Sequence, residues 1–112
     1  SMEILGRVTR GLAAYIYSID YSPEKKRISI KFVKSPQEPL IDRILTFSNI
    51  QQFSDEKNWD EIEDSGYLDL LIGLDEYPER SGVKYVVHTD QREIIFVTDR
   101  QPVLREVSTE RG

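Results

Sequence analysis

Apolar and polar residues alternate along most of this chain, which is the pattern of half-buried β-strands. In the segment RISIKFVK (residues 27–34), Ile28, Ile30 and Phe32 fall on one face and polar side chains on the other. Residues 14–21 alternate in the same way, and the proline-containing connector between the two segments suits an exposed turn. We therefore expect a hairpin built from residues 14–21 and 27–34.

Further strands are expected in the middle of the chain. Two prolines make residues 36–39 a loop, because proline cannot pair inside a central strand. Residues 42–53 (DRILTFSNIQQF) predict a third strand. Residues 67–77 predict another strand, in which four apolar side chains share one face: Leu68, Leu70, Ile72 and Leu74.

The last third of the chain carries the clearest hairpin. The segments KYVVHTD and REIIFVTD form two strands that turn at Asp90 and Gln91, after a turn expected at PERSG (residues 78–82). Residues 100–107 predict a short edge strand, with a frayed end at residues 104–112.

Helical signals are weak. Residues 58–64 could form one or two turns, and residues 6–14 are ambiguous because two glycines interrupt either pattern. Several short strands between turns predict a mainly β fold, an antiparallel β-sandwich or half-open barrel with at most one short helix. Phe32, Phe47 and Phe96 are expected to point into its core.

Length and composition restrict the classes of protein. The 112 residues predict a single domain over 1–112, with Ser1 a tag remnant before a native Met2. The chain has no cysteine, which excludes disulfide scaffolds and thiol nucleophiles. No apolar run approaches the ~18 residues that span a membrane, so we expect a cytoplasmic protein without membrane contact.

Negative charge is concentrated in the middle of the chain. Residues 54–79 hold ten acids and one base, although the net charge of the whole chain is only −5. A surface of this kind repels nucleic acid and attracts cationic partners. We therefore expect a protein partner and no nucleic acid.

Motifs for catalysis and cofactor binding are lacking. His88 is the sole histidine, and no G-x-S-x-G elbow accompanies it. The acids do not match a calcium loop, and the phosphate-cradling glycine motifs are missing. We predict no catalytic residue, no metal ligand and no cofactor, and a non-enzymatic protein.

The acidic stretch SDEKNWDEIEDSG (residues 54–66) surrounds the only tryptophan. One interpretation is that Trp59 packs this stretch onto the fold while the acids are merely solvated. The other is a binding surface, because interface hot spots favour Trp and Tyr and charge complementarity speeds encounter. Its expected partner-binding residues are Asp55, Glu56, Trp59, Asp60, Glu61, Glu63, Asp64 and Tyr67.

Four segments carry a resemblance to a known family. The segments YIYSIDYSPEKKRISIKF, RILTFSNIQQF, LLIGLDEY and KYVVHTDQREIIFV, within residues 15–98, resemble small all-β bacterial immunity proteins of polymorphic toxin systems, including contact-dependent growth inhibition. These segments encode strands and turns rather than chemistry, so the resemblance transfers no site residue.

The resemblance implies a function in binding. Immunity proteins neutralise a cognate toxin domain, and many such toxins are nucleases whose active sites are basic because they hold phosphate. An acidic inhibitor would match that charge. Two alternatives stay open, namely a small accessory or ligand-binding β domain without a toxin partner, and a weak hydrolase that uses carboxylates.

Overall fold

The computed structural model describes residues 2–9, 13–38, 40–57 and 68–107. In these residues, eight strands form an antiparallel sheet in the order β4-β7-β6-β5-β1-β2-β3-β8. The mainly β prediction with one short helix is therefore confirmed. The elements are α1 (Met2–Thr9), β1 (Tyr15–Ser22), β2 (Arg27–Val33), β3 (Ile41–Phe47), β4 (Gln51–Lys57), β5 (Asp69–Glu79), β6 (Gly82–Thr89), β7 (Arg92–Thr98) and β8 (Val103–Glu106).

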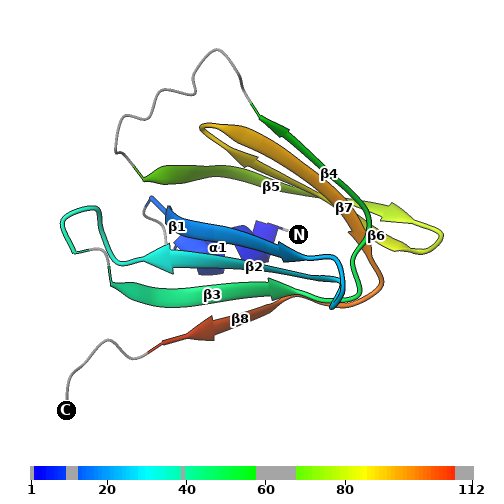
Figure 1. The fold of residues 1–112 in the computed structure, drawn as a ribbon, viewed down its shortest axis with the longest axis horizontal. Coiled ribbons are helices and arrows are strands. Elements are labelled where there is room, and N and C mark those ends of the chain that lie inside the picture. The colour runs from blue at the N-terminus through cyan, green and yellow to red at the C-terminus, as the bar shows by residue number, and fades with distance from the viewer. Residues whose placement is uncertain (1, 10–12, 39, 58–67, 108–112) are drawn as a thin grey trace.

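The sheet is divided into two groups of strands (Figure 1). We call β1, β2, β3 and β8 the first half-sheet, and β4, β5, β6 and β7 the second half-sheet. They join where β1 pairs with β5 at only two positions, Tyr15 with Leu70 and Ile16 with Asp69. Because this join is so short, side-chain packing must hold most of the contact between the halves.

Both predicted hairpins are present. β1 and β2 pair with Tyr21 opposite Ile28, and β6 and β7 pair with Val87 opposite Ile94. Alternation along β2 and β3 sends one set of side chains into a common core and the other set to the outer face. The faces expected for the first strand are wrong in part, because a register shift between Ile16 and Ser18 breaks the alternation of β1. In β6, three successive residues are buried.

The core lies between the two half-sheets, and its three phenylalanines are fully buried as predicted. Phe47, at the end of β3, packs against Tyr85 and Phe96 of the second half-sheet, with ring centroids 5.0 and 4.8 Å away. Tyr21 of β1 stacks on Phe53 of β4 at 3.9 Å. Aromatic contacts thus bridge the halves where the backbone does not.

The predicted strand over residues 42–53 is wrong in one respect, because it is two strands. β3 ends at Phe47 and β4 begins at Gln51 in the other half-sheet. Asn49 has φ 54°, a left-handed conformation that asparagine tolerates better than most residues. Its side chain donates to Asp99 Oδ1 at 2.7 Å, which ties this crossing to the β7–β8 crossing beside it (Figure 1).

The face predicted for residues 67–77 is also wrong. A register shift between Leu71 and Gly73 interrupts the alternation, so Leu71 and Leu74 are buried while Ile72 is 57% exposed. Such a bulge turns the side chains that follow it to the other face. The expected turn at residues 78–82 is shorter, because β5 continues through Glu79 and β6 begins at Gly82.

The sequence pattern did not predict the N-terminal helix α1. Its Val8 is fully buried in the core, and Val8 O accepts a hydrogen bond from Arg43 Nη1. The helix expected at residues 58–64 lies outside the described residues.

The predicted frayed end, residues 104–112, begins too early in the chain. Residues 104–106 belong to β8, and Val107 N donates to Asp42 O at 2.8 Å. Residues 108–112 lie outside the described part of the chain.

Candidate functional site

Only two of the eight predicted partner-binding residues, Asp55 and Glu56, lie in the described part of the chain. Both are on β4, an edge strand of the sheet. The other six residues lie outside it, and their sequence connects β4 with β5: Trp59, Asp60, Glu61, Glu63, Asp64 and Tyr67. Both ends of that connection are therefore held in the second half-sheet.

Asp55 and Glu56 point to opposite faces. Asp55 is in register with the core residue Ile94, and its two carboxylate oxygens accept from Arg92 Nε and Nη2. The hydrogen bond that Arg92 donates to Asp55 raises the pKa of Arg92 above its ordinary value. Asp55 is therefore held in a partly buried, bidentate ion pair that joins β4 to β7.

Glu56 belongs to an exposed acidic surface on the outer face of the second half-sheet. It is directly opposite Glu93 of β7, which in turn is opposite His88 of β6. Asp75 reaches the same face from β5. We call Glu56, Asp75, Glu93 and His88 the acidic face.

His88 lies between two carboxylates of this face. Its Nε2 is 3.0 Å from Asp75 Oδ2, and its Nδ1 is 3.6 Å from Glu93 Oε1. Both ring nitrogens are thus directed at carboxylates, and its imidazole is 37% exposed. This geometry suits a surface bridge between strands and places no hydroxyl nucleophile on either nitrogen.

The like-charged pair on β4 and β7 carries a cost. Two carboxylates directly opposite each other on neighbouring antiparallel strands repel and destabilise the pairing. The contact of His88 with Glu93 offsets this only when the imidazole is protonated. The side chains of Glu56 and Glu93 therefore do not stabilise the pairing of β4 with β7, although their backbones belong to it.

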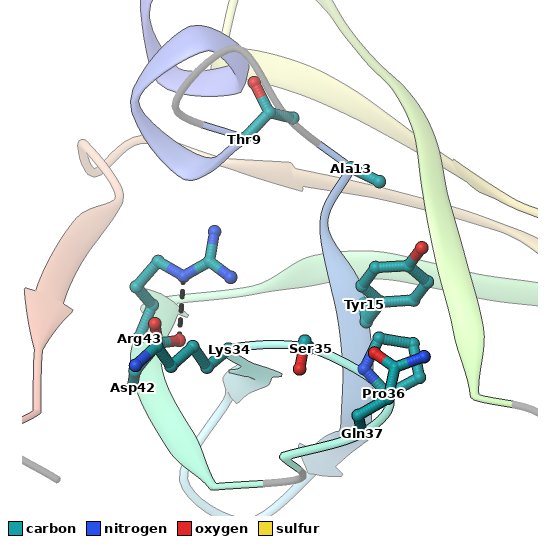
Figure 2. A pocket seen from close by; sticks show the side chains of 9 residues that line it. All are labelled: Thr9, Ala13, Tyr15, Lys34, Ser35, Pro36, Gln37, Asp42 and Arg43. Carbon is teal, nitrogen blue, oxygen red and sulfur yellow. Dashed lines mark hydrogen bonds and ion pairs between the residues drawn. The ribbon is translucent and has the colours of Figure 1, made fainter.

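The described residues also form a cleft of about 550 Å³ beside α1 (Figure 2). The Arg43 guanidinium is directed into it, while Tyr15 and Pro36 stand on another wall. Arg43 is buried and donates to Val8 O, Val33 O and Asp42 Oδ1. Its donors tie α1 to β2 and β3, which makes it a structural arginine.

The second cation of the cleft is also paired, since Lys34 Nζ is 3.6 Å from Glu38 Oε2. Within the described ranges, no group of three or more histidine and acidic side chains could hold a metal ion. The acidic face is therefore the better candidate for a functional surface than this cleft.

Sequence reasoning missed Asp75, His88 and Glu93 as a group. The alternation of β6 and β7 could have placed His88 and Glu93 on one face. The position of Asp75 could not be read in the same way, because the bulge in β5 shifts its face.

Comparisons with known proteins show the fold alone. No family model matches the chain, and no curated protein matches it in sequence. A crystal structure of an uncharacterized protein from Neisseria gonorrhoeae is similar with a TM-score of 0.58 and 13% sequence identity, over 85% of this chain and 92% of that one. In the described residues, no helix is long and apolar enough to cross a membrane.

Proposed function

We propose that this protein is a non-enzymatic immunity protein that binds and neutralises a cationic domain of a bacterial toxin in the cytoplasm. The acidic face carries the proposal, together with the acids of residues 58–67. The resemblance of residues 15–98 to immunity proteins suggests the toxin, and a nuclease is the expected class because its active site is basic.

The distribution of charge supports a surface that meets a cationic partner. The strands of the second half-sheet contain seven acids and three bases, whereas those of the first contain three acids and four bases. The sequence that connects β4 with β5 contains four more acids. A field of one sign on one side of a molecule orients an oppositely charged partner during encounter.

The chemistry of each group suggests a division of roles. Exposed carboxylates on a sheet face act at long range and raise the association rate, while a buried aromatic anchor slows dissociation. Glu56, Asp75 and Glu93 would steer the toxin domain, and Trp59 would supply the anchor. Asp55 would act through Arg92, by holding the edge strand β4 in place.

The experiment begins with the gene immediately upstream, where a toxin gene is expected. Its C-terminal domain is expressed in a test bacterium with and without this protein, and growth is measured. Binding rates of the purified pair are then measured at low and high salt. We expect full protection, and an association rate that falls with salt because exposed charges are screened over ~10 Å at 0.1 M.

Two matched variants localise the effect. Glu56→Gln with Asp75→Asn and Glu93→Gln removes three charges from the acidic face. The control removes three exposed acids elsewhere, by Asp20→Asn, Glu24→Gln and Glu38→Gln. The first variant should slow association about 10-fold or more at low salt, and the control should change it little.

Trp59→Ala should instead speed dissociation, with a loss of binding of ~2 kcal/mol or more for a hot spot. The proposal fails if the upstream domain does not inhibit growth, or if this protein does not restore growth in its presence. It also fails if both charge variants bind at the wild-type rate.

A further inference from the structure

The outer face of the first half-sheet is basic and lies outside the acidic face. It forms a shallow groove of about 430 Å³ on β2, β3 and β8. We call it the basic groove. Its lining residues are Arg27, Ser29, Lys31, Ile44, Thr46, Ser48, Val103 and Arg105.

The cations of the basic groove have no carboxylate partner. No acid lines the groove, and in the described parts of the chain none lies within ion-pair distance of Arg27, Lys31 or Arg105. Asp20 is the carboxylate on β1 next to the groove, opposite Ser29, and it accepts a hydrogen bond from Ser18 at 3.1 Å. Three positive charges therefore face solvent together on one sheet surface.

The strand register fixes the spacing of these charges. Arg27 and Lys31 are four residues apart on β2, about 13 Å along the strand. Lys31, Ile44 and Arg105 form one row across β2, β3 and β8, so Arg105 is two strand spacings, about 9.6 Å, from β2. The hydroxyls of Ser29 and Thr46 form the next row, between Lys31 and Arg27.

The groove also offers apolar contact. Val103, which is 63% exposed, and Ile44 both line it. None of the described residues that line it is aromatic, so these residues offer no stacking platform of the kind that holds single-stranded nucleic acid. Cations beside small apolar and hydroxyl groups suit a polypeptide better than a polynucleotide.

We propose that the basic groove binds an extended acidic segment of a partner protein. In an extended chain, side chains on one face recur every ~6.7 Å, so residues i and i+4 are ~13 Å apart. Carboxylates at these two positions would meet Arg27 and Lys31. The side chain of the residue midway between them would face the hydroxyls of Ser29 and Thr46.

The test uses two synthetic peptides of identical composition. One has glutamates at i, i+2 and i+4 of an extended segment with threonine and valine between them. The other has the three glutamates in succession, which places them on alternating faces. Binding is measured by titration calorimetry at low salt, and we expect the first peptide to bind at least 10-fold more tightly.

Matched variants of the protein locate the binding. Arg27→Gln with Lys31→Gln and Arg105→Gln removes the three groove charges, and should weaken binding of the first peptide at least 10-fold. The control removes three exposed cations elsewhere, by Lys25→Gln, Arg80→Gln and Arg100→Gln, and should leave the affinity unchanged. Circular dichroism of both variants reports whether the sheet is intact.

Three results would overturn the proposal. Equal affinity for the two peptides would mean that charge alone is recognised. Tighter binding of a twelve-residue oligothymidylate, lost in the groove variant, would assign the groove to nucleic acid. Concentration-dependent self-association in sedimentation, lost in the same variant, would assign it to a second copy of this chain.

Discussion

Phe47→Ala should cause a large loss of stability, because Phe47 joins the two half-sheets. Its side chain is fully buried, and it meets Tyr85 and Phe96 at interplanar angles of 59° and 69°. Truncating a buried phenylalanine costs about 3–5 kcal/mol through lost transfer energy and the cavity left behind. Two aromatic contacts of about 0.5–1.5 kcal/mol each place this site toward the upper end.

The expected loss is a large part of the total. A domain of this length has roughly 6–17 kcal/mol of stability at the usual value per residue. Equilibrium unfolding in urea, followed by circular dichroism, measures the change as a lower midpoint with an unchanged slope. The control is Tyr17→Ala, whose side chain is 54% exposed, and it should shift stability by less than about 0.5 kcal/mol.

A double-mutant cycle tests the coupling between the halves. If Phe47 and Phe96 interact as described, their alanine variants should be non-additive by about 0.5–1.5 kcal/mol. The reasoning is refuted if Phe47→Ala costs under about 1 kcal/mol. It is also refuted if the cycle is additive, since the rings would then contribute independently.

Three other predictions follow from local geometry. Arg43→Met should cost about 3–5 kcal/mol in urea unfolding, because it leaves buried partners unpaired; a loss under about 1 kcal/mol would contradict its structural role. Gly82→Ala should cost at least about 2 kcal/mol of stability, measured as a lower midpoint of urea unfolding, since φ is +138° and a Cβ would lie 2.3 Å from a backbone oxygen of Thr98. Its counterpart Gly6→Ala, in α1 with nothing within 4 Å, should stabilise by about 0.5–1 kcal/mol; the opposite order of the two would be inconsistent with these backbone geometries. Burial raises the pKa of Tyr85 above its ordinary value of 10.0. The contribution of Tyr85 to stability should therefore be constant below pH 10.0 and fall as the pH rises through the raised pKa. Tyr85→Phe should remove this alkaline loss of stability, and an unchanged loss would assign it to another group.

The strands were predictable where one simple period runs unbroken. Residues 27–32 alternate without interruption, and the core face of Ile28, Ile30 and Phe32 matches the structure. Residues 92–98 form the expected strand, although their apolar run does not alternate. The errors occur where a backbone irregularity changes the period. Asn49 breaks a pattern that continues in sequence, and the bulge at Leu71–Gly73 moves Leu71 and Leu74, rather than Ile72, into the core.

The candidate site was predictable only as a property of composition. The density of acids in residues 54–79 indicated an acidic surface, but not which face each side chain takes. Asp55 and Glu56 are adjacent in sequence and opposite in direction, because successive strand residues alternate. Glu93 and His88 come from a distant hairpin, so only the register brings them to Glu56.

The pairing of β8 with β3 has a consequence during synthesis. β8 follows the other seven strands in sequence, so it leaves the ribosome after them. Until then β3 is an edge strand, and the nascent chain presents an open row of backbone groups that other chains could pair with. The basic groove does not exist at that stage either, since Val103 and Arg105 form one of its walls. A partner that needs this groove would therefore bind only chains that have been made through β8.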